Sequence, residues 1–183
     1  MAIKNVEEIL TLMADRGHAA YFGERISILE HCLQCAYFAE RDRAGAGAIT
    51  AALLHDIGHL LHGLPEDIVE EGNDGLHEEL AAMYLEPWFD EDITAPIRMH
   101  VAAKRYLCSV EPGYLSQLSP ASVDSLHVQG GPMNREEVAA FEAHPYLELA
   151  VQLRRWDDEA KIPHLEVPGL EQYLPHLRVA ARR

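Results

Sequence analysis

The stretch that decides the fold is Ala51-Ala52-Leu53-Leu54-His55-Asp56-Ile57-Gly58-His59. Its small residues and leucines are typical of a buried helix, and the apolar run ends in an imidazole beside a carboxylate. Both side chains are common ligands of transition-metal ions. The glycine that follows at once favours the end of the helix. We therefore expect His55 and Asp56 to bind metal at the inner end of a buried helix.

Further candidate ligands recur at intervals that suit separate helices. They are His31, His77, His100 and Asp157, and with the His55-Asp56 pair they give the order H…HD…H…H…D. Taken alone, His31 would be interpreted as a core histidine and Asp157 as a solvated helix residue. The complete order, with each member on its own amphipathic segment, favours one shared metal site instead.

Composition restricts the class of protein and its partners. The 183 residues suit one domain with a sizeable core, and 48% of them are hydrophobic. His55 and Asp56 interrupt the best candidate for a membrane span. The N-terminus lacks a signal-peptide pattern, so the default expectation is a cytoplasmic location. The net charge of −15 argues against nucleic acid as the main ligand, but a small anion still suits a few buried cations.

Cysteine is scarce and odd in number, with Cys32, Cys35 and Cys108. The first two form a C-x-x-C pattern, but no second pair accompanies them and no thioredoxin-like strand precedes them. We interpret them as small buried hydrophobic residues.

The spacing of apolar residues indicates an all-α fold. We expect helices over residues 5–16, 27–43, 48–57, 77–85, from Asp90 or Asp92 past Lys104, over 120–126, after Asn134, from about Pro145 to Asp157, and over 170–177. No segment alternates as a strand does. The prediction is one helical-bundle domain over residues 1–183, with a core over about 20–160 and a C-terminal flap over 161–183. An exposed loop that suits a lid is expected over 64–75.

Two cations lie close in sequence to predicted ligands. Lys104 follows His100 by one turn on the same helix face, and Arg154 precedes Asp157 by one turn. They could clamp an anion, with ordinary surface cations as the alternative. His59, one turn beyond His55, could face the same cavity without binding metal. The other histidines are expected at the surface or in packing: His18, His62, His127, His144, His164 and His176.

The donor set indicates what the site can hold. Four imidazoles and two carboxylates, without a thiolate, suit iron, manganese or zinc. If Asp56 bridges two ions, the protein supplies about seven bonds, whereas two six-coordinate ions need about twelve. The open positions favour a catalytic site over a structural one.

The residue order resembles the HD-domain superfamily, and particularly its dinuclear branch, because simpler HD phosphohydrolases generally lack the two middle histidines. Within that branch, the chain is similar over about residues 20–160 to the organophosphonate-cleaving mixed-valent diiron oxygenases. The segments that carry this similarity are Tyr21-Phe22-Gly23-Glu24 and residues 29–36, 54–60, 118–122 and 129–133.

This resemblance implies two iron ions, Fe(II) and Fe(III), with Asp56 as the bridging ligand. One ion would be held by His31, His55, Asp56 and Asp157, and the other by Asp56, His77 and His100. The phosphonate would be bound by His59, Lys104, Ser122 and Arg154. In a mobile segment that covers the site, Glu24 would recognise the amine of the substrate and Tyr21 would yield its position to O2. Asp56, Tyr21 and Glu24 are therefore the expected catalytic residues.

The implied reaction uses O2 to cleave the carbon–phosphorus bond of a 1-hydroxy-2-aminoethylphosphonate-type substrate. The products would be phosphate and glycine, or an N-methylated equivalent such as glycine betaine. The expected partner is this small organophosphonate, and no nucleic acid, membrane or protein partner is implied. The main alternative is an HD-type metal-dependent phosphohydrolase, which would work without O2. An inositol-oxygenase-like enzyme for a neutral polyol and a ligand sensor without turnover are further alternatives.

Overall fold

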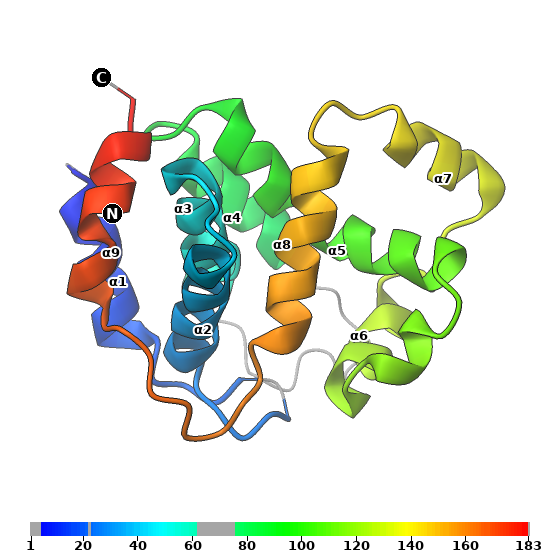
Figure 1. Cartoon of the computed structure of the whole chain (residues 1–183), viewed down its shortest axis with the longest axis horizontal. Coiled ribbons are helices and arrows are strands. Elements are labelled where there is room, and N and C mark those ends of the chain that lie inside the picture. The colour runs from blue at the N-terminus through cyan, green and yellow to red at the C-terminus, as the bar shows by residue number, and fades with distance from the viewer. Residues whose placement is uncertain (1–4, 22, 62–75, 183) are drawn as a thin grey trace.

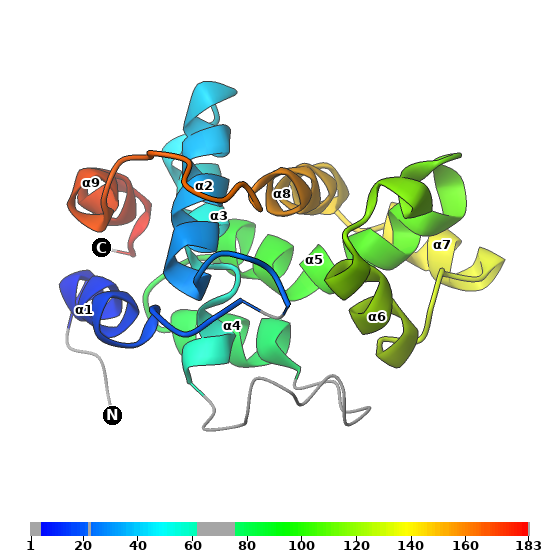
Figure 2. The same ribbon diagram turned by 90° about the horizontal axis from the view of Figure 1, so that it is seen from below.

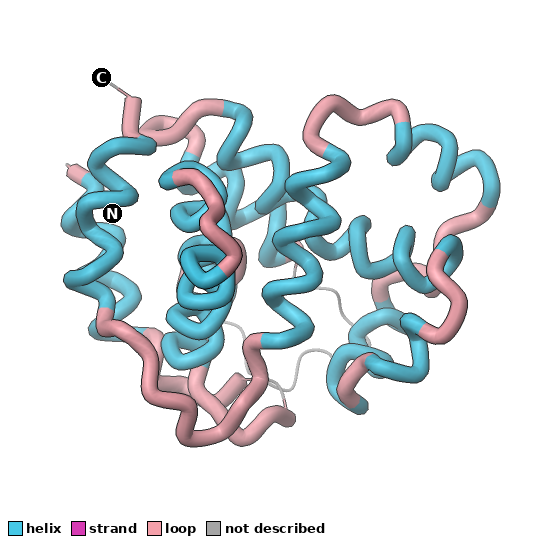
Figure 3. The backbone as a smooth tube through the Cα atoms, in the orientation of Figure 1, coloured by secondary structure: helices cyan, strands magenta, loops and turns pink. Residues whose placement is uncertain are grey.

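The computed structural model describes residues 5–21, 23–61 and 76–182, and over these ranges the chain consists of helices and loops without a strand (Figure 3). The prediction of an all-α fold is confirmed. The helices are α1 (Val6–Arg16), α2 (Ile28–Arg41), α3 (Ala46–Leu54), η1 (Ile57–Leu60), α4 (His77–Leu85), α5 (Glu91–Val110), η3 (Tyr114–Gln117), α6 (Pro120–Val128), α7 (Arg135–Glu142), α8 (Leu147–Glu159) and α9 (Leu170–Ala180). The loop expected over 64–75 lies outside the described residues.

Helix α3 lies at the centre of the bundle, against α2, α5, α8 and α9. Its residues from Ala51 to Leu54 are fully buried, as an all-round apolar helix requires. Helices α1 and α9 lie side by side on one flank, while α5 and α8 extend toward α6 and α7 on the other (Figures 1 and 2). Tyr173 and Leu177 of α9 are buried in the main core. None of the helices within the described ranges has the length and apolar character that a membrane span requires.

The helix starts follow the capping pattern of the sequence. The side chain of Asn134 accepts from the amide of Glu137, and Glu137 accepts from the amide of Asn134, so the capping box expected at α7 is confirmed. A second capping box joins Ser27 and Glu30 at the start of α2. These contacts satisfy amides that the helix itself leaves unpaired, and each stabilises its helix by about 1 kcal/mol.

The central helix ends earlier than its apolar pattern predicts. We expected it to include residues 48–57, but α3 ends at Leu54, and the 3-10 helix η1 begins at Ile57. Adjacent side chains on an α-helix point about 100° apart. His55 caps α3 with a backbone that is still helical, whereas Asp56 departs from the helix with φ −100° and ψ 11°. His55 Nε2 then lies only 3.4 Å from Asp56 Oδ2. The helix therefore ends where two neighbouring side chains must face one point.

Candidate metal centre

Three imidazoles are oriented by backbone carbonyls so that Nε2 faces the interior. The Nδ1 atom lies 2.8 Å from the Ala160 carbonyl oxygen in His31, 2.9 Å from that of Ala52 in His55, and 2.7 Å from that of Ile97 in His100. Such contacts place the proton on Nδ1 and the lone pair on Nε2, which is the usual arrangement of metal-binding histidine. For His77, the Nδ1 atom lies 3.4 Å from Glu78 Oε2.

The Asp56 carboxylate lies between two pairs of these imidazoles. Its Oδ2 is 3.4 Å from Nε2 of both His31 and His55, and these two nitrogens are 3.2 Å apart. Its Oδ1 is 3.4 Å from Nε2 of His77 and 3.5 Å from Nε2 of His100, which are 3.1 Å apart. Each carboxylate oxygen therefore faces a different histidine pair.

These spacings fit metal ligation. Donor atoms bound at about 2.1 Å and meeting at right angles lie about 3.0 Å apart. Asp56 Oδ2 and Asp157 Oδ1 are buried and receive no hydrogen bond, which is costly for a carboxylate unless a cation compensates. The geometry also groups Asp56 with His77 and His100, and Asp157 with His55 and His100. The described residues thus form groups that could hold metal ions.

Asp157 joins this centre to a cluster of cations. Its Oδ1 is 3.4 Å from His31 Nε2, while its Oδ2 is 2.7 Å from Arg154 Nη1. Arg154 also hydrogen-bonds to Asp158, and its Nε donates to the Tyr114 hydroxyl at 3.3 Å. Asp157 and Arg154 are both buried. One carboxylate therefore has one oxygen toward the imidazoles and the other toward a guanidinium.

Ser122 lies between two further cations. Lys104 Nζ donates to Ser125 Oγ at 2.6 Å and lies 3.4 Å from the Ser122 carbonyl oxygen. Lys161 Nζ donates to Ser122 Oγ at 2.8 Å. The first turn of α6 thus contacts lysines from α5 and from the segment after α8. Together with Arg154, these two lysines form a cluster of three cations beside the imidazoles in an otherwise acidic chain. We call Lys104, Arg154 and Lys161 the cationic wall.

The electrostatics keep most of the donors in metal-binding form. His55 is the exception, because burial opposes its charge but the neighbouring Asp56 outweighs that effect and raises the pKa of His55. Burial lowers the pKa of His31 and of His100 to about 4, and it also lowers the pKa of His77. Burial opposes ionisation of Asp157, but Arg154 and Lys161 hold its pKa well below the usual value. Neutral imidazoles and ionised carboxylates are the forms that ligate metals.

His59 and Tyr21 stack on predicted ligands, and Glu24 contacts Tyr21. His59 Nε2 is 3.9 Å from Asp56 Oδ1, and its ring stacks on that of His77 at 4.0 Å. The Tyr21 ring stacks on that of His31 at 4.0 Å, and burial and the charges of Asp56 and Asp157 raise the pKa of Tyr21. The Glu24 amide donates to the Tyr21 carbonyl at 2.7 Å, which forms a tight turn.

Comparison with known proteins places this arrangement in a family. Residues 28–140 match the HD domain family. A hydroxymethylphosphonate dioxygenase of Gimesia maris is 45% identical over 173 residues, which are 93% of this chain and 85% of the relative. A glycine-betaine-forming [1-hydroxy-2-(trimethylamino)ethyl]phosphonate dioxygenase of Leisingera caerulea is 42% identical over 170 residues, 93% of this chain and 87% of the relative. The chain therefore belongs to the HD-domain phosphonate oxygenase family.

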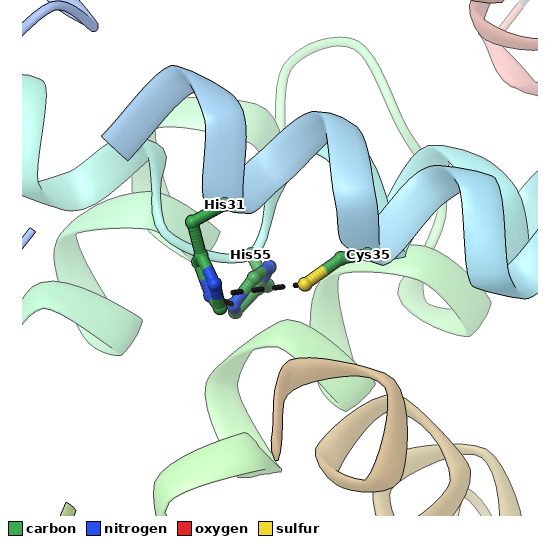
Figure 4. Close-up of side chains that lie close together, drawn as sticks. All are labelled: His31, Cys35 and His55. Carbon is green, nitrogen blue, oxygen red and sulfur yellow. Dashed lines mark hydrogen bonds between the residues drawn. The ribbon is translucent and has the colours of Figure 1, made fainter. Parts of the chain in front are cut away.

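Sequence reasoning missed two side chains beside this centre. Lys161 was not considered because it follows a helix end, where spacing alone does not indicate the direction of a side chain. Cys35 was interpreted only as a buried hydrophobe, yet its Sγ lies 3.7 Å from His31 Nε2 and groups with His31 and His55 (Figure 4). Burial raises the pKa of Cys35, which favours the neutral thiol and agrees with the packing interpretation.

Gly58 of the HD domain permits a close backbone approach. A Cβ atom at this position would lie 1.9 Å from the carbonyl oxygen of His77 and 2.7 Å from its carbonyl carbon. We expect Gly58→Ala to lower the free energy of unfolding by about 1–3 kcal/mol. It should also reduce the metal content, because His77 must move away from Asp56. Thermal unfolding and metal analysis test both effects.

Gly47→Ala is the matched control for this substitution. A Cβ atom there would meet Ile93 at an ordinary distance of 3.6 Å, and alanine favours the helix more than glycine does. The control should retain its metal and melt at or slightly above the wild-type temperature. Equal melting temperatures for the two variants would contradict the close approach at Gly58.

Proposed function

We propose that this protein is a diiron dioxygenase that cleaves the carbon–phosphorus bond of a 1-hydroxy-2-aminoethylphosphonate-type substrate, releasing phosphate and glycine. Atom balance assigns one oxygen atom of O2 to the new carboxylate and the other to phosphate. The curated relatives named above support the reaction class, because both are named as phosphonate dioxygenases.

The arrangement of Asp56 and Asp157 carries this proposal. Asp56 separates two histidine pairs, which suits a bridging ligand between two ions. Asp157 faces His31 with one oxygen and Arg154 with the other. An anionic substrate held by Arg154 would therefore lie next to the ions, as a phosphonate with an adjacent hydroxyl requires.

Each residue group has a distinct role in the proposed reaction. His31, His55, Asp56 and Asp157 would hold one iron ion, and Asp56, His77 and His100 the other. These ions would supply the redox chemistry with O2. Lys104, Arg154, Ser122 and His59 would bind the phosphonate through charge and hydrogen bonds. Tyr21, stacked on His31, would cover the open side of the centre until substrate and O2 enter.

Glu24 is the residue that we propose recognises the amine. Its Oε1 is a buried acceptor that no hydrogen-bond donor within the described ranges satisfies. A primary ammonium would supply that donor, whereas a trimethylammonium has no N–H to donate. The open acceptor therefore favours the free amine over the N-methylated analogue.

We expect Glu24→Gln to lower kcat/KM for 2-amino-1-hydroxyethylphosphonate by about tenfold to a hundredfold, because a charge-assisted hydrogen bond contributes about 1.5–3 kcal/mol. Hydroxymethylphosphonate has no amine, so its kcat/KM should change little and serves as the internal control. Equal losses for both substrates would remove Glu24 from amine recognition.

The function is tested on iron-loaded protein with three substrates in air. These are hydroxymethylphosphonate, racemic 2-amino-1-hydroxyethylphosphonate and its trimethylated analogue, with phosphate and the carboxylate product measured. We expect O2-dependent phosphate release, with glycine from the amine. Absence of phosphate from all three, with two iron ions bound per chain, would reject the assignment. Phosphate ester cleavage that continues under argon would favour the phosphohydrolase instead.

Lys104 gives the reaction an expected pH dependence. Burial and the charge of Arg154 lower the pKa of Lys104 to about 7. The ammonium is therefore charged below pH 7 and loses its charge as the pH rises, so kcat/KM for a phosphonate should fall between about pH 7 and 9. In Lys104→Arg the guanidinium stays charged over this range, so the fall should disappear. Parallel profiles for the two proteins would show that Lys104 does not cause the decline.

A further inference from the structure

Lys161 and Lys104 both contact serines of α6, but Lys161 is the one that donates to the Ser122 hydroxyl. Its Nζ donates to Ser122 Oγ at 2.8 Å, whereas Asp157 Oδ1 lies at 3.7 Å and Asp158 Oδ1 at 3.8 Å. Both carboxylate distances exceed that of a hydrogen bond. Its main directional contact is therefore with the serine hydroxyl, while the carboxylates attract it at longer range.

The backbone on both sides of Lys161 is fixed to α2. The Ala160 carbonyl accepts from His31 Nδ1 at 2.8 Å. On the other side, Gln34 Nε2 donates to the Ile162 carbonyl at 2.9 Å, and the Ile162 amide donates to Gln34 Oε1 at 3.0 Å. Gln34 is buried. These contacts limit how far the backbone at Lys161 can move, so the side chain extends toward Ser122 from a fixed point.

The hydrogen bond from Lys161 determines what the Ser122 hydroxyl can do. An ammonium has only donors, so Ser122 Oγ must be the acceptor in this contact. The hydroxyl hydrogen of Ser122 is then left to donate elsewhere. The Ser122 amide already donates to Ser119 Oγ at 3.2 Å, and the Ser122 carbonyl lies 3.4 Å from Lys104 Nζ. The serine is thus held on three sides, with its hydroxyl hydrogen available for an anion.

We propose that Lys161 is a positioning residue for phosphonate binding. Its ammonium donates to Ser122 Oγ and so orients the Ser122 hydroxyl as a hydrogen-bond donor toward the phosphonate oxygens. This inference rests on the proposed function. It adds a third cation, from the segment after α8, to the pair formed by Lys104 and Arg154. Lys161 thereby joins the turn that carries Asp157 to the turn that carries Ser122.

The experiment measures binding as well as turnover. Iron-loaded protein is titrated calorimetrically with hydroxymethylphosphonate without O2, for wild type, Lys161→Met, Ser122→Ala and the double variant. We expect each single variant to weaken binding by about tenfold. The double variant should be no weaker than the weaker single one, because both remove the same oriented hydroxyl. Lys161→Arg, which keeps a charged donor, should recover part of the affinity.

Unchanged affinity in Lys161→Met, or additive losses in the double variant, would overturn a role through Ser122. If Lys161→Met fails to fold or to retain iron, Ser122→Ala decides. Unchanged binding by Ser122→Ala would show that the serine hydroxyl does not bind the anion, and Lys161 could then not act through it. In steady-state assays KM should rise more than kcat falls, which a general loss of folded enzyme would not produce.

A control variant and a second titrant distinguish the role of Lys161 from the proposed oxygenase function. Arg178→Met, which removes a surface cation paired with Glu7, should bind as wild type does. Inorganic phosphate serves as a second titrant, because the anion site can be tested even if the protein cleaves no phosphonate. Failure of wild type to release phosphate from any substrate rejects the function. Phosphonate cleavage with an unaffected Lys161→Met rejects only the role of the lysine.

Discussion

His77→Ala should reduce the metal content from two ions per chain to one and abolish the reaction with O2. His77 Nε2 and His100 Nε2 lie 3.4 and 3.5 Å from Asp56 Oδ1. In the proposed centre, the loss of either imidazole would leave the ion at these three side chains with two protein ligands. In the proposed mechanism this ion would contribute several kcal/mol to the transition state, so phosphate release should fall at least about a thousandfold. Metal analysis and oxygen consumption measure the two effects together.

The control for His77→Ala is His127→Ala, which removes an exposed imidazole from α6. It should bind two ions and react as wild type does. The other proposed ion, with His31, His55, Asp56 and Asp157 as its ligands, should persist in His77→Ala, because none of these residues is altered. Oxygenase activity retained with one ion per chain would contradict a mechanism that needs two. Loss of both ions would show that the two halves do not bind independently.

The sequence predicted the location of the imidazole cluster because its signals are local and periodic. An apolar run that ends in His55 and Asp56 can be recognised from the residues alone, and His31 and His100 lie on helices whose buried faces follow from their spacing. The capping box at Asn134 was equally visible. Each segment shows by its own pattern which face is buried, and the order of the ligands along the chain then indicates one shared site.

Other features depend on contacts between segments far apart in the chain. Gly58 could be recognised as a helix terminator, but not as the point where the backbone of His77 approaches. Gln34 holds Ile162 across 128 positions, and that contact places Lys161 beside Ser122. Neither pair has a spacing rule, since the tertiary fold alone brings the partners together. The helix boundary at Leu54 was misplaced for a similar reason, because the geometry of the site ends α3 before its apolar pattern does.

Arg154→Met should raise KM for a phosphonate by at least about thirtyfold while lowering kcat much less. Hydrogen bonds to Tyr114 and Asp158 and the ion pair with Asp157 engage three of the five N–H donors of the guanidinium. The other two donors and the positive charge would bind the substrate. Removing one partner of a buried charged contact costs about 2–5 kcal/mol. Because this interaction is made with the bound substrate and kept in the transition state, its loss should appear mainly in KM.

The adjacent Arg155 separates substrate binding from a general effect of charge. Its guanidinium pairs with Glu111 at the surface, so Arg155→Met removes the same charge from the same helix without altering the cationic wall. KM should then stay at the wild-type value. In Arg154→Met the iron content must also be measured, because Asp157 loses its nearest cation. A higher KM with full iron content assigns Arg154 to the phosphonate, and lost iron with an unchanged KM assigns it to holding Asp157 for the metal.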